Sequence, residues 1–256
     1  MSSANKYTLK PSLSEKFKGI IWKVEIDDTF TTVALETRVA EAHQTYFSAF
    51  DFSSGECLFR EISVEDSWNW GLNYVNRNHL LLHSYVTEKS PEHKGIIAID
   101  TTGTIKWQHF NKAVQFVSEK GLLVYNPSLE PRRPELISTE SGSVLNSSGV
   151  FLEPLTRNIY LPDLLAEDLV KDNPRCPEAV GPVSHIFYND KEVYSFHVRS
   201  GKFYSQKLLI YQDNTVILDE ILEENIQKLN PEAFFIGHNH LFCIRKGKQE
   251  FVSYLL

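Results

Sequence analysis

The sequence predicts an all-β fold made of repeated sheets, and two observations support this prediction. A similar phrase occurs at residues 49–59 and 98–107: an apolar strand ending at Asp, a polar turn closed by Gly, and a second strand with an aromatic residue four positions after the Gly. A weaker third copy covers residues 136–145. In addition, 12% of the residues are aromatic and a single one is Met, a composition typical of sheets.

The spacing of the repeat indicates which all-β architecture to expect. Gly55 and Gly103 lie 48 positions apart, and Gly142 follows 39 positions later. A period of roughly 40 to 50 residues is that of one propeller blade. We therefore predict a single β-propeller of about five four-stranded blades over residues 19–256, after a polar N-terminal lead-in at residues 1–18.

Short apolar runs separated by turn residues give the expected strands in order. The first unit holds strands at 20–26, 31–38, 45–52 and 56–62, and the second at 69–75, 79–86, 95–100 and 104–110. The third has strands at 114–117 and 122–126 followed by the weak hairpin, and the fourth at 185–188, 193–199, 207–212 and 215–221. The fifth has strands at 233–237, 240–245 and 250–256.

The fifth unit lacks one strand, which a closed ring has to supply from elsewhere, because unpaired sheet edges promote aggregation. Residues 19–26 are one candidate donor, since Gly19 and Trp22 loosely match the Gly and aromatic residue of the repeat. The alternative keeps residues 19–26 in the first unit.

A proline-rich stretch interrupts the repeat at residues 147–183. Five prolines exclude a long central strand there, so we predict an insertion. Within it, residues 162–170 have apolar positions at helical spacing and a proline at the start, which predicts one short helix.

The phrase at residues 98–107 resembles the blade signature of quinoprotein-like β-propellers, those with PQQ-type repeats. This resemblance implies that Asp100 and Gly103 shape the last hairpin of a blade and that Trp107 packs between blades. Quinone-dependent enzymes of that group have about eight blades and an adjacent Cys-Cys pair, and this chain lacks that pair. The resemblance therefore implies a bacterial propeller of unknown function with no cofactor and no transferable catalytic residue.

Charge and composition narrow the choice of partner and compartment. The formal net charge of -7 disfavours nucleic acid and membrane surfaces as partners. Cys57, Cys176 and Cys243 are widely spaced and suggest neither a disulfide framework nor a zinc site. No apolar leader segment precedes Gly19, so a cytoplasmic monomer is expected, unless a leader was trimmed.

The long connections of the predicted blades all fall on one face, which we take as the candidate binding surface. Asp66, Trp68 and Trp70 there offer a carboxylate beside two indoles, which suits a carbohydrate, another small molecule or a protein segment. The competing interpretation is that one of these indoles packs in the core, because alternate residues of a strand face opposite ways. Arg132 and Arg133 offer two guanidinium groups for a carboxylate or phosphate, or else form a solvated turn.

Catalytic and metal signatures are sparse in the chain. The familiar nucleotide, protease and hydrolase motifs are missing, and His238 with His240 lacks an ordered third metal ligand. We therefore predict a non-catalytic scaffold for protein or ligand recognition. The alternative is a glycosidase-like enzyme with carboxylates gathered at the central channel, for which Asp163, Glu167 and Asp168 are candidates.

Overall fold

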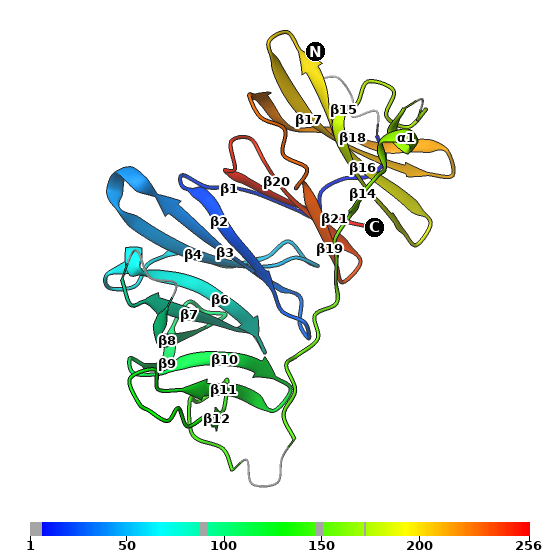
Figure 1. Ribbon diagram of the computed structural model, residues 1–256. Coiled ribbons are helices and arrows are strands. Elements are labelled where there is room, and N and C mark those ends of the chain that lie inside the picture. Colours follow the sequence, from blue (N-terminus) through cyan, green and yellow to red (C-terminus); the bar gives the residue numbers. More distant parts are fainter. Residues whose placement is uncertain (1–6, 88–91, 147–150, 172) are drawn as a thin grey trace. The chain divides into compact units, whose positions relative to one another are not determined.

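The computed structural model describes residues 7–87, 92–146, 151–171 and 173–256, and nearly all its regular structure is β-strand (Figure 1). Within these residues the strands form five antiparallel sheets, divided between two compact units. The three-sheet unit is Lys18–Asn158, and the two-sheet unit combines Met1–Phe17 with Ile159–Leu256. The all-β prediction is confirmed.

The three-sheet unit consists of sheets in which each strand pairs with the next strand along the chain (Figure 1). The first sheet contains β2 (Ile20–Ile26), β3 (Thr32–Val39), β4 (Gln44–Asp51) and β5 (Cys57–Ile62). The second contains β6 (Trp70–Asn76), β7 (His79–Tyr85), β8 (His93–Asp100) and β9 (Ile105–His109). The third contains β10 (Ala113–Ser118), β11 (Gly121–Tyr125) and β12 (Glu135–Ile137), with an isolated bridge from Ile137 to Val144. Two 3-10 helices, η1 (Ala40–Ala42) and η2 (Ser67–Asn69), lie in the β3–β4 and β5–β6 connections.

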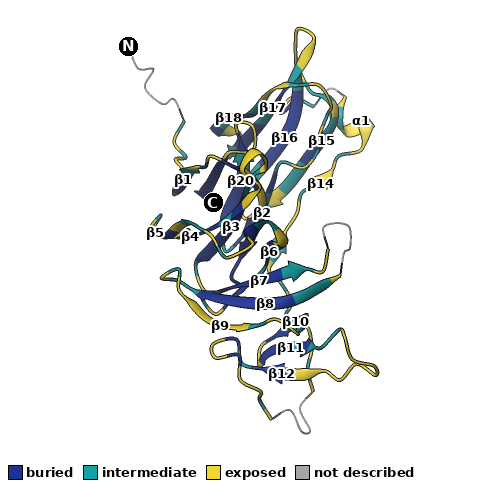
Figure 2. Ribbon diagram, turned by 90° about the vertical axis from the view of Figure 1, so that its left-hand side faces the viewer, coloured by how far each residue is buried: buried dark blue, intermediate teal, exposed yellow. Residues whose placement is uncertain are grey.

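The core of this unit lies between neighbouring sheets. Leu80 and Leu82 on β7 pack with residues of the first sheet, whereas Leu81 packs with residues of the third. Side chains alternate between the two faces of a strand, so a strand covered on both faces needs an unbroken apolar run. Figure 2 shows the result: β7 and β8 are largely buried, and the outer strand β9 is largely exposed.

Turn chemistry explains why Asp recurs in the repeated phrase. Asp51 Oδ1 accepts hydrogen bonds from the backbone N–H groups of Ser53 and Ser54, at 2.9 and 2.7 Å. Asp100 Oδ1 does the same for Thr102 at 2.9 Å. In the third copy Ser138 takes this place, with its Oγ as the acceptor. A side chain that caps its own turn fixes the hairpin locally.

Packing between sheets explains why the phrase pairs a glycine with an aromatic residue. A Cβ on Gly103 would lie 3.3 Å from the side chain of Phe59, which belongs to the preceding sheet. A Cβ on Gly142 would lie 2.7 Å from Trp107, and Trp107 also donates from Nε1 to the Thr139 carbonyl at 2.9 Å. The aromatic residue of one sheet therefore packs on the glycine turn of the next.

The two-sheet unit contains two five-stranded sheets. One has the order β14-β15-β16-β17-β18 and the other the order β1-β21-β20-β19-β13. Strands of the first are β14 (Asp163–Leu164), β15 (Val180–Tyr188), β16 (Lys191–Ser200), β17 (Phe203–Gln212) and β18 (Thr215–Ile226). Strands of the second are β1 (Leu13–Lys16), β21 (Glu250–Leu255), β20 (His240–Arg245), β19 (Phe234–Gly237) and β13 (Ile159–Tyr160).

The strand that completes the last sheet comes from the expected lead-in, which corrects our reading of residues 1–18. Leu13–Lys16 pairs antiparallel with β21, with Leu13 opposite Ser253, and Leu13 is buried. Residues 20–26 instead pair with β3, so the alternative that kept them in the first sheet is the right one. Phe17, directly after this strand, is buried too, and its backbone N–H donates to the Gln249 carbonyl at 2.8 Å, so two apolar residues and backbone pairing hold the segment against β21.

The proline-rich stretch is more sheet-like than expected. β13 pairs with β19 and β14 pairs with β15, and β15 already begins at Val180. The expected helix at 162–170 reduces to α1 (Glu167–Val170). The first half of the expected helix forms β14 instead, and directly after it the Leu165 backbone N–H donates to the Val183 carbonyl at 2.9 Å. Residues 147–150, also part of the expected insertion, lie outside the described residues.

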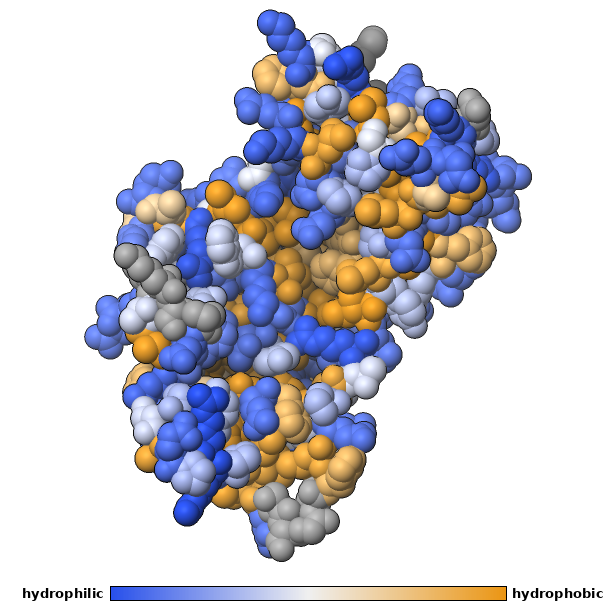
Figure 3. Space-filling model, viewed as in Figure 1, coloured by the Kyte–Doolittle hydropathy of each residue, from blue (hydrophilic) through white to orange (hydrophobic). Residues whose placement is uncertain are grey.

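The surface mixes hydrophilic and hydrophobic residues on the face seen in Figure 3. Trp22, Phe110 and Leu129 are among the large apolar side chains that remain exposed in the three-sheet unit. Across the described residues, no helix has the length and apolar character needed to cross a membrane.

Candidate functional site

The candidate site lies at the end of the three-sheet unit where the longer connections meet. His43, in the β3–β4 connection, stacks on Trp68 in the β5–β6 connection, with ring centroids 4.3 Å apart. Beside this pair, Ser67 Oγ accepts a hydrogen bond from the Thr45 backbone N–H at 3.1 Å. Side chain and backbone contacts therefore fix η2, and with it Trp68, against the start of β4.

Connections of the second and third sheets meet in the same way. Lys94 Nζ, near the start of β8, donates to Ser128 Oγ in the β11–β12 connection at 3.1 Å. The Gly95 backbone N–H donates to the carbonyl of Lys112, in the β9–β10 connection, at 2.7 Å. Within this unit, contacts thus join the connections of neighbouring sheets.

An arginine within reach of two indoles is the central feature of the site. The guanidinium carbon of Arg38, on β3, lies 5.3 Å from the ring centroid of Trp22 and 5.2 Å from that of Trp68. Both distances are within the range of cation–π attraction. Trp22, on β2, is 65% exposed, so most of its indole faces solvent. We call Trp22, Arg38 and Trp68 the tryptophan–arginine clamp.

A buried carboxylate orients the arginine. Glu36 Oε1 accepts a hydrogen bond from Arg38 Nε at 2.6 Å, and Glu36 Oε2 accepts one from the Leu72 backbone N–H at 2.7 Å. Both oxygens of Glu36 are therefore engaged. Arg38 Nη2 is buried and has no hydrogen-bond partner among the described residues. Burying a charged donor without a partner is costly.

A glycine on β6 allows a histidine to pack close to that carboxylate. A Cβ on Gly71 would lie 3.2 Å from His83 Nε2 and 3.4 Å from Glu36 Oε2. Such contacts are tight for real side chains, so the missing Cβ permits this close packing. His83 is only 5% exposed, and neither of its ring nitrogens has a hydrogen-bond partner in the described part of the chain.

A second imidazole covers His83. The rings of His83 and His93 stack with centroids 3.7 Å apart. Burial lowers the pKa of His83 to about 3, helped by His93, Lys23 and Arg38, and burial together with Lys23 also lowers the pKa of His93. His83 is therefore uncharged at neutral pH, and a neutral imidazole offers one hydrogen-bond donor and one acceptor.

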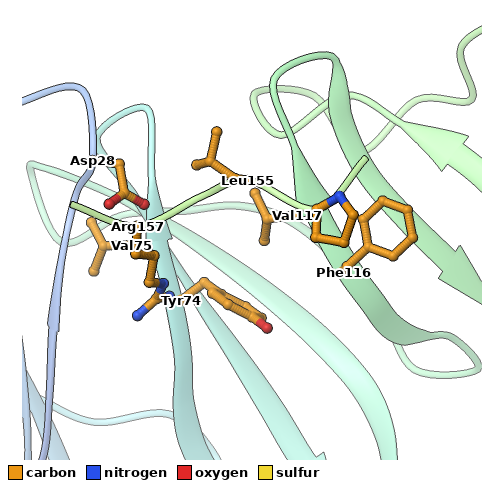
Figure 4. Close-up of a pocket in the computed structure, with 8 residues that line it drawn as sticks. Asp28, Tyr74, Val75, Phe116, Val117, Leu155 and Arg157 are labelled. Atoms are coloured by element: carbon orange, nitrogen blue, oxygen red, sulfur yellow. The ribbon is translucent and has the colours of Figure 1, made fainter. Parts of the chain in front are cut away.

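A second group of paired charges in the same unit centres on Glu25, on β2. Lys23 Nζ lies 3.1 Å from Glu25 Oε1, and Arg157 pairs with the other oxygen of this buried carboxylate. The Arg157 guanidinium also lies 4.9 Å from the ring centroid of Tyr74 (Figure 4). The pocket drawn there has a volume of about 120 Å³ and is lined by Asp28, Tyr74, Val75, Phe116, Val117, Pro154, Leu155 and Arg157.

The structure separates the three residues expected around the β5–β6 connection. Trp68 lies in the clamp, half-buried. Trp70 is 6% exposed and packs in the core, edge-on to Phe110, as the competing interpretation held. Asp66 is exposed and begins η2, where its carbonyl accepts the Asn69 N–H at 3.0 Å.

The two arginines expected nearby lie in the exposed β11–β12 connection. Arg132 lies 5.0 Å from the ring centroid of Tyr125, and its Nε is 4.0 Å from Glu130. Arg133 is exposed as well. In the described part of the chain, these contacts join neither arginine to the clamp.

The candidate catalytic and metal residues do not converge. Asp163 is exposed on β14, and Glu167 and Asp168 are exposed in the first turn of α1. His240 Nδ1 lies 2.9 Å from the carbonyl oxygen of His238, across the β19–β20 turn. Over the described ranges, no group of three or more His, Cys, Asp or Glu residues has an arrangement that could hold a metal ion.

Sequence reasoning missed Arg38, Glu36 and Trp22 as site residues. One signal was available: Glu36 and Arg38 are the two charged residues, at alternate positions, of a strand whose other residues are apolar or threonine. Such residues share one face of the strand and have to find partners there. Nothing local indicates that Trp22 comes next to Arg38, because that contact depends on the pairing of β2 with β3.

The comparisons with known proteins identify a family match for part of the chain. A family model described as a domain of unknown function (DUF4905) matches residues 26–107, a range that contains Glu36, Arg38, Trp68 and His83. No curated protein matches the sequence.

Several solved structures are similar to the chain at low identity. They include the β-propeller domain of the Trilobed protease from Pyrococcus furiosus (12% identity, TM-score 0.32) and Raptor from Chaetomium thermophilum (9%, 0.40). Alignments cover 91% and 97% of this chain, but only 65% and 29% of those two chains. A member of the DUF4221 family from Bacteroides vulgatus has 9% identity and a TM-score of 0.33, with 98% of each chain covered. At these TM-scores the likenesses carry no argument about activity.

Proposed function

We propose that this protein is a non-catalytic recognition module, built on propeller-like blades, that binds a carbohydrate or peptide ligand at the tryptophan–arginine clamp. The observation that carries the proposal is the guanidinium of Arg38, which lies within cation–π range of two indoles, one of which, Trp22, is 65% exposed. Rigid aromatic faces beside a few fixed polar groups are typical of ligand sites.

The clamp supports binding better than hydrolysis. Glycoside hydrolysis needs two carboxyl groups about 5 to 9.5 Å apart that can exchange protons or attack the sugar. Glu36 is the carboxylate that contacts the clamp, and both its oxygens already accept hydrogen bonds. Its role is therefore to orient Arg38.

An array of immobilised oligosaccharides and peptides tests this function. We expect the purified protein to retain a subset of them and the Trp22→Ala variant to lose that subset, because Trp22 is exposed and its removal leaves the core intact. Phe30→Ala is the matched control, since Phe30 is an exposed aromatic residue in the β2–β3 turn, at the opposite end of β2. Unchanged retention by Trp22→Ala would exclude the clamp as the binding site.

A further inference from the structure

Another cavity of the three-sheet unit lies among its tight turns and has a volume of about 120 Å³. The β6–β7 turn, the β10–β11 turn and the hairpin that follows β12 form its walls, with the residues Arg77, Lys120, Gly121, Ser138, Thr139, Glu140 and Leu145. Because β6 runs from Trp70 to Asn76, Arg77 lies at the opposite end of this strand from the connection that carries Trp68. The cavity is therefore separate from the clamp.

The guanidinium of Arg77 links two of these turns. Arg77 Nη2 donates a hydrogen bond to the Glu119 carbonyl in the β10–β11 turn at 2.6 Å, and Arg77 Nη1 lies 3.9 Å from Glu140 Oε1 in the hairpin. The side chains of Arg77 and Glu140 are 49% and 66% exposed, so solvent and ligands reach both of them. An exposed ion pair at this distance contributes little to stability. An anion that binds more tightly can therefore replace the Glu140 carboxylate beside Arg77.

Two further residues bring hydrogen-bond donors to the cavity. Lys120 is exposed, and within the described residues no hydrogen bond or ion pair engages its ammonium group. Ser138 Oγ accepts hydrogen bonds from the backbone N–H groups of Glu140 and Ser141, at 3.2 and 3.3 Å. A hydroxyl that accepts in this way keeps its own proton for donation to a ligand. The cavity thus combines two cations with a hydroxyl donor.

This combination favours an anion that has several oxygen atoms. Arginine and lysine side chains both bind phosphate groups, the first as a planar fork of donors and the second as a compact charge. A carboxylate has two oxygens and one negative charge, whereas a phosphate monoester has three acceptor oxygens and about 1.5 to 2 negative charges. Three donor groups with two positive charges, from Arg77, Lys120 and Ser138, match the phosphate monoester better.

We infer that this cavity binds the phosphate group of a small phosphorylated molecule, with Arg77, Lys120 and Ser138 as its donors. The cavity is small, so the phosphate enters it and the rest of the ligand stays at the surface. Inorganic phosphate shares this chemistry, and the test below separates it from a phosphate monoester. The inference does not depend on the function proposed for the clamp, because the two sites share no residue.

Nuclear magnetic resonance titration of the isotope-labelled full chain measures binding at this place, through the backbone amide signals of Gly121, Ser138 and Glu140. The probes are glycerol phosphate as a phosphate monoester, inorganic phosphate, and acetate as a carboxylate, all at equal ionic strength. We expect the monoester to shift these signals and to bind about 10- to 100-fold more tightly than acetate, the range of a charged hydrogen bond. Inorganic phosphate should bind no more tightly than the monoester.

Two variants with opposite expected effects assign the binding to the cavity. Lys120→Gln should weaken monoester binding about 10-fold or more, because it removes one of the two positive charges. Glu140→Gln should tighten it about two- to fivefold, because it removes the carboxylate that competes for Arg77. Lys202→Gln is the matched control, since Lys202 is an exposed lysine in the tight β16–β17 turn of the other unit, and it should behave as wild type.

Each contrary result overturns a stated part of the inference. Equal binding of acetate and the monoester overturns the assignment to phosphate, and tighter binding of inorganic phosphate overturns a phosphorylated molecule as the ligand. Unchanged affinity in Lys120→Gln or in Glu140→Gln overturns the placement of the phosphate in this cavity. No binding of either phosphate probe overturns the inference as a whole. The array result for Trp22→Ala separately decides whether the function proposed for the clamp fails.

Discussion

The buried imidazole of His83 makes the stability of the three-sheet unit depend on pH. In the folded protein the pKa of His83 is about 3, whereas an unfolded histidine titrates near 6.5. Between pH 3 and pH 6.5, His83 is protonated in the unfolded chain and neutral in the folded protein. The stabilising contribution is therefore complete above pH 6.5 and decreases as the pH falls toward 3.

The size of the effect follows from the distance below pH 6.5. At pH 5, about 1.5 units below the pKa of an unfolded histidine, protonation stabilises the unfolded chain by about 1.4 kcal/mol per pH unit. His83 alone therefore lowers the free energy of unfolding by roughly 2 kcal/mol at this pH. His83→Phe keeps a ring of similar shape and removes the titrating group. We expect wild type to lose about 2 kcal/mol more than His83→Phe between pH 7.5 and pH 5.

Urea unfolding followed by indole fluorescence is the assay, because every tryptophan reports on this unit. Equal losses in wild type and His83→Phe would show that His83 does not stay neutral in the folded protein. Nitrogen chemical shifts of the His83 ring give an independent check, since they should remain those of a neutral imidazole down to about pH 4.

Two further predictions concern packing. Gly142→Ala should destabilise the three-sheet unit by about 2–4 kcal/mol in indole-monitored urea unfolding, because its φ of 68° is strained for alanine and its Cβ would lie 2.7 Å from Trp107. Gly201→Ala has a similar φ of 62° with no atom within 4 Å, and it should leave this indole transition unchanged because it lies in the other unit. Leu13→Ala should cost the two-sheet unit about 2–4 kcal/mol, seen as faster hydrogen exchange in β21; unchanged exchange would show that β1 contributes little to that sheet.

Local chemistry explains which parts of the fold could be predicted from the sequence. Asp51 and Asp100 cap their own turns, so the hairpins are visible in a few consecutive residues. The polar segment around Leu13 has no such signal, because its place beside β21 depends on residues more than 230 positions away. A short edge strand of this kind is defined by its partner rather than by its own side chains.

The candidate site was predictable only in part, for the same reason. The connection that carries Trp68 was among the predicted binding positions, and alternation along a strand allowed for the burial of Trp70. Arg38 and Trp22 come together through strand pairing, and Gly71 admits His83 through packing between sheets. These contacts join positions that no short motif connects.

Pairing between β1 and β21 also constrains the order of folding during synthesis. The three-sheet unit is one continuous stretch of chain and has all its strands once residue 158 has left the ribosome. The last sheet of the other unit joins Leu13–Lys16 to Glu250–Leu255, so its first strand has to wait until residues 250–255 have been translated. During that interval β1 is an unpaired strand, and a chaperone or a neighbouring nascent chain has its best opportunity to bind it.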